Sequence, residues 1–139
     1  MNAVFVDTAG WMASADLADP DHPRSLAARD AALEAGRILV TTDFVADETL
    51  TLLRARLGLR AAAEWWRTIE STPRVRWERI DSERFEKARQ IFFQHHDKDY
   101  SFTDCTSFVV MRELRLTQAL TADRHFRQMG FQVLPSMRR

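Results

Sequence analysis

Short runs of apolar residues recur along the chain and are separated by longer stretches with helical spacing. Runs rich in β-branched and aromatic residues and bounded by turn formers are typical of strands buried on both faces of a sheet. A segment in which apolar and polar residues alternate is also typical of a strand. The pattern predicts strands at residues 3–6, 38–41, 75–80, 118–122 and 131–134.

The stretches between these strands carry signals for helix ends. Thr42 and Asp81 stand where an N-cap residue is needed, and Gly36 and Gly58 stand where helices stop. A cluster of turn-forming residues at 19–23 separates the first two helical stretches. Helices are predicted at residues 10–17, 25–35, 44–57, 59–71, 82–94 and 101–114, with a polar loop at 95–100 and a short turn around Phe126.

The order of these elements predicts the class of fold. Strands that alternate with helices need crossover connections, which favour a mostly parallel sheet covered by helices on both faces. The chain is therefore expected to be an α/β protein. In such sheets the functional groups lie beyond the carboxyl ends of the strands. The 139 residues show no internal repeat or linker, so we expect a single domain spanning residues 1–139.

Composition narrows the picture further. Hydrophobic residues make up 45% and charged residues 29%, as in globular proteins. A lone cysteine, Cys105, excludes an internal disulfide and a cysteine-based zinc site. The N-terminus lacks the features of a signal peptide, and no segment approaches a membrane span, so we expect a cytoplasmic protein with no membrane partner. The formal net charge is zero, so any binding of nucleic acid must depend on local charge.

Two aspartates directly follow predicted strands. Asp7 comes after the strand at 3–6, and Asp123 comes after the strand at 118–122. The carboxyl ends of parallel strands share one edge of a sheet, so both side chains are expected at that edge. An aspartate at a strand end also commonly forms a turn or caps a helix, and that alternative stays open for each residue.

Two further acids fall on apolar helix faces. Glu48 is spaced i+3 from Val45 and i−4 from Leu52, and Asp104 precedes Phe108 by four residues. A lone carboxylate is costly to bury, so such groups are usually paired, hydrogen-bonded or metal-bound. Asp104 has another explanation, because residues 101–104 read Ser-Phe-Thr-Asp and fit a capping box. Glu48 has no basic residue four positions away.

Convergence of these four acids would create a strongly repulsive cluster. The repulsion must be relieved by protonation or by a cation. Mg²⁺ and Mn²⁺ match ligation by carboxylates and water. A metal held in this way activates water and stabilises charge on phosphate, so phosphodiester hydrolysis is the favoured chemistry. We therefore predict Asp7, Glu48, Asp104 and Asp123 as catalytic, metal-binding residues.

With these residues assembled, the chain resembles the PIN-domain family, and within it the VapC-type toxins of bacterial toxin–antitoxin pairs. The matching segments are VFVDT, DETLTLL, DKDYSFTDCTSFVVM and LTADRHF followed by GF. The resemblance implies a three-layer α/β/α sandwich with a five-stranded sheet. It also implies an endoribonuclease that depends on Mg²⁺ or Mn²⁺ and cuts structured RNA, such as tRNA or an rRNA stem-loop.

The resemblance extends to supporting residues and partners. The four acids fall on the family's acidic positions. Asp99 matches a further acid often found upstream of the third motif, and Thr8 and Thr121 match small hydroxyl residues near the acids. Toxins of this kind are similar in forming homodimers and in being silenced by a cognate antitoxin.

Two other functions were weighed against the nuclease. A non-catalytic PIN-like module would keep the fold and bind RNA or protein, but it would have no reason to keep an electrostatically expensive acid cluster. Phosphatases with an aspartate nucleophile place a second aspartate two residues later, where this chain has Ala9. The sequence therefore favours the metal-dependent nuclease.

Overall fold

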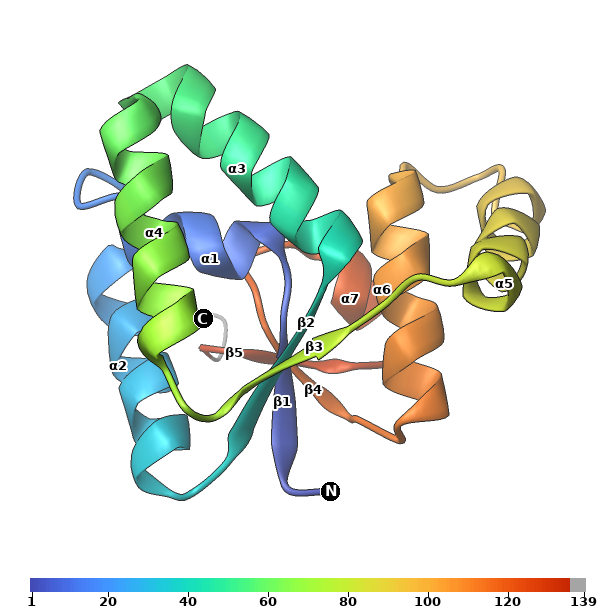
Figure 1. Cartoon of the computed structure of the whole chain (residues 1–139). Coiled ribbons are helices and arrows are strands. Elements are labelled where there is room, and N and C mark those ends of the chain that lie inside the picture. The colour runs from blue at the N-terminus through green and yellow to red at the C-terminus, as the bar shows by residue number, and fades with distance from the viewer. Residues whose placement is uncertain (136–139) are drawn as a thin grey trace.

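A five-stranded parallel sheet forms the centre of the molecule (Figure 1). The computed structural model describes residues 1–135. The strand order is β3-β2-β1-β4-β5, and each of the four neighbouring pairs is parallel. The α/β class predicted from the sequence is therefore confirmed. The strands are β1 (Ala3–Val6), β2 (Ile38–Thr42), β3 (Val75–Glu78), β4 (Gln118–Leu120) and β5 (Gln132–Leu134).

Helices cover both faces of this sheet. In Figure 1, α1, α2 and α4 lie on one side, α5, α6 and α7 lie on the other, and α3 crosses above the carboxyl ends of the strands. This is the three-layer arrangement that the resemblance implied. The helices are α1 (Thr8–Ala15), α2 (His22–Glu34), α3 (Asp43–Leu57), α4 (Leu59–Ser71), α5 (Ser82–Gln94), α6 (Phe102–Glu113) and α7 (His125–Gln128).

Most differences from the predicted boundaries arise at element ends. Helix α1 begins at Thr8, two residues before the predicted start, because Asp7 caps it directly after β1. Helix α2 begins at His22 rather than at residue 25, because a proline in the first helical turn requires no amide hydrogen bond there. Strand β4 ends at Leu120 rather than at residue 122. The predicted domain range includes residues 136–139, which lie outside the described residues.

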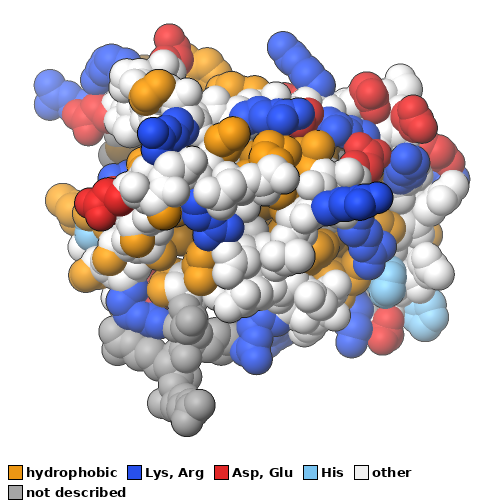
Figure 2. Space-filling model, turned by 90° about the horizontal axis from the view of Figure 1, so that it is seen from below, with side chains coloured by type: hydrophobic (Ala, Val, Ile, Leu, Met, Phe, Trp, Pro, Cys, Tyr) orange, Lys and Arg blue, Asp and Glu red, His pale blue; other side chains and the backbone are white. Residues whose placement is uncertain are grey.

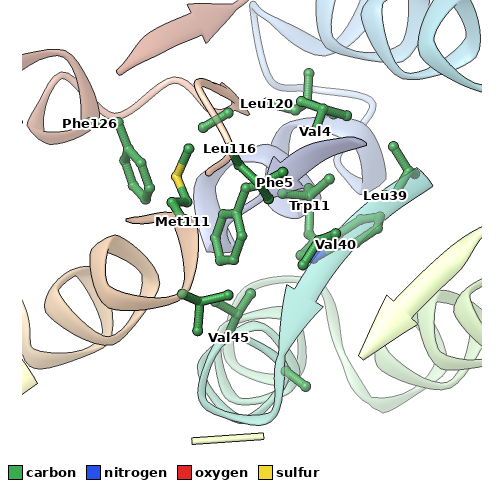
Figure 3. Close-up of a cluster of buried hydrophobic side chains, with 14 of the residues drawn as sticks. Val4, Phe5, Trp11, Leu39, Val40, Val45, Met111, Leu116, Leu120 and Phe126 are labelled. Carbon is green, nitrogen blue, oxygen red and sulfur yellow. The ribbon is translucent and has the colours of Figure 1, made fainter. Parts of the chain in front are cut away.

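The core surrounds β1, whose four residues are all buried. Successive side chains of a strand point to opposite faces, so β1 has apolar contacts on both sides of the sheet. Figure 3 shows Phe5 pointing toward Met111 of α6 and Phe126 of α7. The rings of Phe5 and Phe126 lie 6.3 Å apart, and neither side chain is exposed. This packing fixes α6 and α7 against the strand that carries Asp7.

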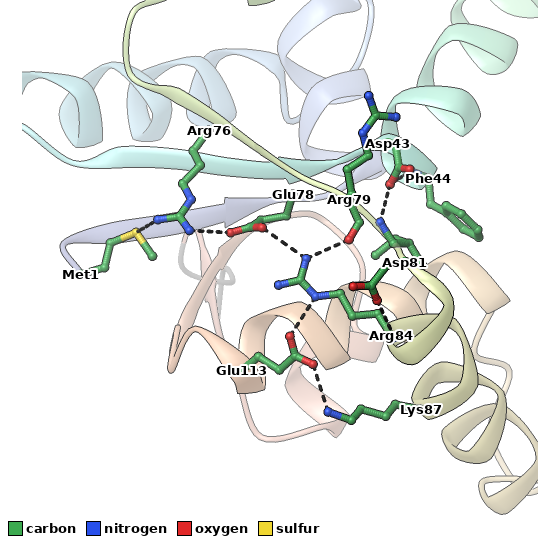
Figure 4. A network of polar contacts seen from close by, with 11 residues as sticks. Met1, Asp43, Phe44, Arg76, Glu78, Arg79, Asp81, Arg84, Lys87 and Glu113 are labelled. Atoms are coloured by element: carbon green, nitrogen blue, oxygen red, sulfur yellow. Dashed lines mark hydrogen bonds and ion pairs between the residues drawn. The ribbon is translucent and has the colours of Figure 1, made fainter.

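Helix α5 is attached by aromatic contacts to Phe102 of α6 and by a network of polar contacts (Figure 4). Ala88 is the buried residue of this 13-residue helix. Arg84 donates from Nε to Glu113 of α6 at 2.8 Å and from Nη1 to Glu78 of β3 at 3.2 Å. Lys87 also pairs with Glu113, at 3.2 Å. The ion-pair network therefore connects α5 to one helix and to the edge strand of the sheet.

The opposite end of the molecule carries basic side chains. Figure 2 views the protein from below Figure 1, and Lys and Arg side chains are spread over this face. Arg37 donates to the carbonyl of Ala3 at 2.9 Å, and Arg74 donates to the carbonyl of Leu33 at 2.7 Å. Arg37 thus contacts the first residue of β1, and Arg74, which directly precedes β3, contacts the last turn of α2. Within residues 1–135, no helix has the length and apolar character needed to cross a membrane.

Candidate active site

An open cleft lies at the carboxyl ends of β1 and β4. The chain passes from β1 to β2 and β3 on one side, and then returns to the other side of β1 to form β4. Ligands of open α/β sheets typically bind at such a reversal of strand order. The cleft is lined by Asp7, Thr8, Ala9, Met12, Asp19, Glu48, Leu52, Arg56, Asp99, Ser101, Asp104, Ala122, Asp123 and His125. All four predicted acids therefore line one cleft.

Asp7 is held in place from two directions. It is the N-cap of α1, and its Oδ1 accepts a 2.8 Å hydrogen bond from the amide of Gly10. Its Oδ2 accepts a 2.8 Å hydrogen bond from the hydroxyl of Thr121, beyond β4. Burial raises the pKa of Asp7 to about 8, and the charges of Asp104 and Asp123 add to the increase, while the two hydrogen bonds oppose it. The carboxylate is therefore costly to ionise without a nearby cation.

Gly10 allows α1 to approach the neighbouring strand closely. A Cβ atom at this position would lie 2.1 Å from the carbonyl oxygen of Leu120 in β4. No side chain fits there, so glycine brings the first turn of α1 against β4. This approach places the Asp7 carboxylate beside Thr121.

Asp104 combines both roles that its sequence allowed. Its amide donates to the hydroxyl of Ser101 at 2.9 Å, and its Oδ2 accepts from the Ser101 amide at 3.2 Å, so the capping box is present. The same carboxylate lines the cleft and is 9% exposed. Its pKa is raised by burial and by the charge of Asp123, against the opposing effect of Ser101 and His125. Capping and participation in the site therefore coexist.

Asp123 is positioned by the turn that follows β4. Its amide donates to the hydroxyl of Thr121 at 2.8 Å, so this hydroxyl connects Asp123 to Asp7. Its Oδ1 accepts from the amide of His125 at 2.9 Å. The contact that the resemblance implied between Thr121 and an acidic residue is thus present.

His125 was not identified in the sequence, yet it lies between two of the acids. Its Nδ1 is 2.9 Å from Oδ2 of Asp104 and 3.1 Å from Oδ1 of Asp123. The Tyr100 ring packs edge-to-face against the imidazole, with centroids 5.3 Å apart. The signal in the sequence was a histidine two residues after a strand-end aspartate. The prediction treated this histidine as part of the short turn around Phe126.

The Glu48 side chain is less buried than its position on the apolar face of the helix predicted. The buried residues of α3 are Val45, Ala46, Thr49 and Leu53, so Glu48 lies at the edge of that face and is half-buried. Its side chain lines the cleft and makes no hydrogen bond or ion pair with any residue in the range 1–135. The carboxylate is therefore available to a ligand.

The remaining predicted residues occupy different places in the cleft. Asp99 is exposed on the loop before α6 and lines the cleft without contacting the other acids. Thr8 is buried, and its hydroxyl has no hydrogen-bond partner within the described range. Asp19 and Arg56 also line the cleft. Asp19 was missed because it belongs to a predicted turn cluster.

The donor set fits a divalent cation. Within the described residues, one ligand atom each from Asp104, Asp123 and His125 lie within 4.8 Å of one another. Asp7 and Glu48 line the same cleft outside this group. The unpaired hydroxyl of Thr8 adds an unsatisfied polar group beside the acids. Carboxylate oxygens dominate the set, as suits hard cations. A cation bound beside Asp7 would oppose the increase in its pKa that burial causes.

Comparison with known proteins identifies the family of the chain. The family model described as "PIN domain" matches residues 4–132. The protein named 23S rRNA-specific endonuclease VapC20, from two strains of Mycobacterium tuberculosis, is 34% identical over 128 residues. The match covers 92% of this chain and 95% of the relative.

A solved structure shows the same architecture. The crystal structure of Mycobacterium tuberculosis VapC20, titled a sarcin–ricin loop cleaving toxin, aligns with a TM-score of 0.82 at 34% identity. The alignment covers 93% of this chain and 96% of that chain. On sequence and on structure, the chain belongs to the PIN-domain family of nucleases.

Proposed function

We propose that this protein is a divalent-metal-dependent endoribonuclease whose site is the cleft containing Asp7, Glu48, Asp104 and Asp123. The observation that carries the proposal is the meeting of these acids, from β1, α3, α6 and the turn after β4, in one cleft. Family membership supports nuclease activity. It also supports dependence on a divalent metal, because PIN nucleases use such ions. We expect Mg²⁺ or Mn²⁺ as the ion, and we treat residues 1–139 as a single PIN-like domain.

The residues divide into those that hold the cation and one that acts on water. Asp7, Asp104 and Asp123 would hold the ion, which when bound lowers the pKa of water and stabilises charge on the phosphate. Thr121 and the Gly10 amide keep the Asp7 carboxylate oriented. Thr8 is proposed to hydrogen-bond water near the acids, and Asp99 to add negative charge at the rim.

Glu48 is assigned as the proton acceptor. Its carboxylate faces the cleft without a partner in the described chain, so it can accept the proton of the attacking water. The water oxygen forms a bond to phosphorus while the bond to the leaving ribose oxygen breaks, and the leaving oxygen takes up a proton from solvent water. Arg56 lines the cleft and is exposed, and is suited to contact a phosphate of the RNA backbone.

The substrate is proposed to be structured RNA, with an rRNA stem-loop favoured over tRNA. VapC20 is named for cleavage of 23S rRNA and of the sarcin–ricin loop, and it matches this chain over nearly its whole length. We further propose that the chain is the toxin of a toxin–antitoxin pair, silenced by a cognate antitoxin. Because ribosomes and tRNA are cytoplasmic, the proposed activity belongs in the cytoplasm.

A homodimer is proposed through an exposed aromatic face. This face consists of Phe85, Phe92 and Phe93 on α5, with exposures of 44%, 37% and 67%, beside Phe44 and Phe102. Exposed apolar patches commonly mark interaction sites. A two-fold interface brings the same patch of both subunits together, and the bordering charges include both signs, as at Glu86 and Arg89. A Phe92→Ser, Phe93→Ser variant should elute as a monomer in light-scattering chromatography if this face forms the dimer.

Cleavage of RNA by the purified protein tests the central proposal. The wild type should cut ribosomal RNA when Mg²⁺ or Mn²⁺ is added, whereas Glu48→Gln and Asp104→Asn should not. Asp30→Asn, on the exposed side of α2, serves as the control and should remain active. Undiminished cleavage by both site variants would overturn the proposed site. RNA binding without cleavage in any metal would instead support the non-catalytic PIN-like module.

A further inference from the structure

We propose that His125 is a direct ligand of the divalent cation, together with Asp104 and Asp123, and that the site therefore prefers Mn²⁺ over Mg²⁺. This inference rests on the proposed function, because it concerns the metal of the same cleft. It changes the expected chemistry of the site from all-oxygen ligation to mixed oxygen and nitrogen ligation.

The spacing of the three donors supports ligation. Two neighbouring ligands of an octahedral cation, each about 2.1 Å from the metal, lie about 3.0 Å apart. The Nδ1 atom of His125 is 2.9 Å from Oδ2 of Asp104 and 3.1 Å from Oδ1 of Asp123. Without a cation these spacings suit hydrogen bonds from the imidazole N–H. With a cation the same spacings suit adjacent ligands, so little movement of the side chains is needed.

The imidazole is held in this position from outside the acid pair. Tyr100 is 6% exposed and packs its ring edge-to-face on His125, with an interplanar angle of 81°. The amide of His125 donates to Asp123 at 2.9 Å, which fixes the backbone. Coordination through Nδ1 requires the neutral tautomer with its proton on Nε2, in which Nδ1 offers a lone pair.

A second observation at the cleft is independent of the acids and His125. Thr8 is 7% exposed and lines the cleft, and its Oγ1 has no hydrogen-bond partner in the described part of the chain. Buried hydroxyls are nearly always paired. The unpaired hydroxyl of Thr8 is thus an unsatisfied polar group beside the acids, in the same part of the fold as the three proposed ligands.

The nitrogen donor determines which cation is preferred. Mg²⁺ is a hard ion that takes oxygen ligands and keeps several waters. Transition-metal ions accept imidazole more readily, and Mn²⁺ accepts carboxylates and water as well. A site that has an imidazole among its carboxylate ligands therefore discriminates against Mg²⁺ more strongly than a site built only of acids.

Two substitutions separate ligation from mere positioning. His125→Phe keeps a ring for Tyr100 to pack against but removes the donor. His125→Asn keeps an N–H that can bond the carboxylates, and its amide oxygen is a poor substitute for imidazole nitrogen. The matched control is His96→Phe, on the exposed loop after α5. Equilibrium dissociation constants for Mn²⁺ and Mg²⁺ are measured on each purified protein, and the Mn²⁺ complexes are examined by electron spin-echo spectroscopy for ¹⁴N coupling.

The wild type and His96→Phe should show ¹⁴N coupling to bound Mn²⁺, and both His125 variants should lose it. The affinity for Mn²⁺ should fall at least about tenfold in both His125 variants, with a smaller loss for Mg²⁺. Absence of ¹⁴N coupling in the wild type, or equal losses for the two ions, would overturn the inference. Recovery of Mn²⁺ affinity in His125→Asn would assign His125 to positioning instead.

The same samples distinguish this inference from the proposed function. If ¹⁴N coupling is present but no metal supports RNA cleavage, the ligand assignment stands and the nuclease proposal fails. If RNA is cleaved but ¹⁴N coupling is absent, the nuclease proposal stands and the ligand assignment fails. Asp104→Asn should lower the affinity for both Mn²⁺ and Mg²⁺. That result would show that the binding assay reports on this cleft.

Discussion

The hydroxyl of Thr121 donates a 2.8 Å hydrogen bond to Oδ2 of Asp7 and accepts one of the same length from the amide of Asp123. A single buried hydroxyl therefore sets the relative positions of two acids from different strands. A carboxyl group that loses such a partner also loses its fixed orientation.

Replacement of Thr121 with valine keeps the shape of the side chain and removes the hydroxyl. Orienting partners of this kind typically contribute about 10–100-fold to metal affinity or activity, so we expect losses in that range for RNA cleavage. The unpaired amide of Asp123 should also cost about 1–3 kcal/mol of stability. Thr117→Val, at an exposed threonine before β4, is the control. Wild-type cleavage by Thr121→Val would contradict the orienting role.

Asp7→Asn should stabilise the metal-free protein at high pH. The pKa of Asp7 in the folded chain is about 8, above the ordinary value of 3.8. Its contribution to stability is thus fully present below about pH 4 and is lost as the pH rises through 8. Asparagine has no charge to bury, so the stability of the variant minus that of the wild type should grow by up to about 1 kcal/mol per pH unit in this window.

Thermal melts with a chelator at pH 5 and at pH 9 measure this difference. The exposed Asp30→Asn variant should show little change between the two conditions. If the difference in melting temperature between Asp7→Asn and the wild type is equal at both pH values, ionisation of Asp7 does not cause the pH dependence.

Gly10→Ala should be destabilising, although alanine usually favours helices by about 1 kcal/mol over glycine. The added Cβ would lie 2.1 Å from the Leu120 carbonyl oxygen, so α1 must move away from β4. Crowding of this kind typically costs about 1–3 kcal/mol, and cleavage should fall because Asp7 moves with the helix. Denaturant unfolding measures the stability, and Ser14→Ala in the same helix is the control. Higher stability in Gly10→Ala would show that the helix can shift at no cost.

Divalent metal should raise the melting temperature, because it binds the folded state. A concentration of 100 times the dissociation constant contributes about 2.7 kcal/mol. Differential scanning fluorimetry with and without Mn²⁺ measures the shift, and chelator should reverse it. Asp104→Asn should abolish the shift. An undiminished shift in that variant would place the bound ion elsewhere on the protein.

Local patterns in the sequence were sufficient for every strand and for every helix except α7, which was expected as a short turn. They also placed the two strand-end acids at one edge of the sheet. The run at residues 3–6 and the aspartate that follows it identify both a strand and its functional edge, because a parallel sheet aligns the carboxyl ends of its strands. The capping box at Ser101 and Asp104 was also visible, since it depends on residues only three positions apart.

Other features depend on contacts that no local pattern encodes. The adjacency of β1 and β4 is a tertiary property, and with it comes the bond between Thr121 and Asp7. The depth of Glu48 depends on how α3 rotates against the sheet, and the buried face centres on Val45 and Thr49 instead. His125 follows Asp123 so closely that a turn explained it, and only the approach of α6 reveals its contact with Asp104.

The pairing of β1 with β4 has a consequence for folding of the chain during translation. Asp7 emerges early in synthesis, but its partner Thr121 follows 114 residues later. Until β4 has left the exit tunnel, the first strand has no neighbour on that side. Asp123 and His125 of the cleft are then not yet in place, and neither is the Thr121 hydroxyl that orients Asp7. A nascent chain of this protein therefore has an incomplete cleft until β4 and the turn after it have emerged.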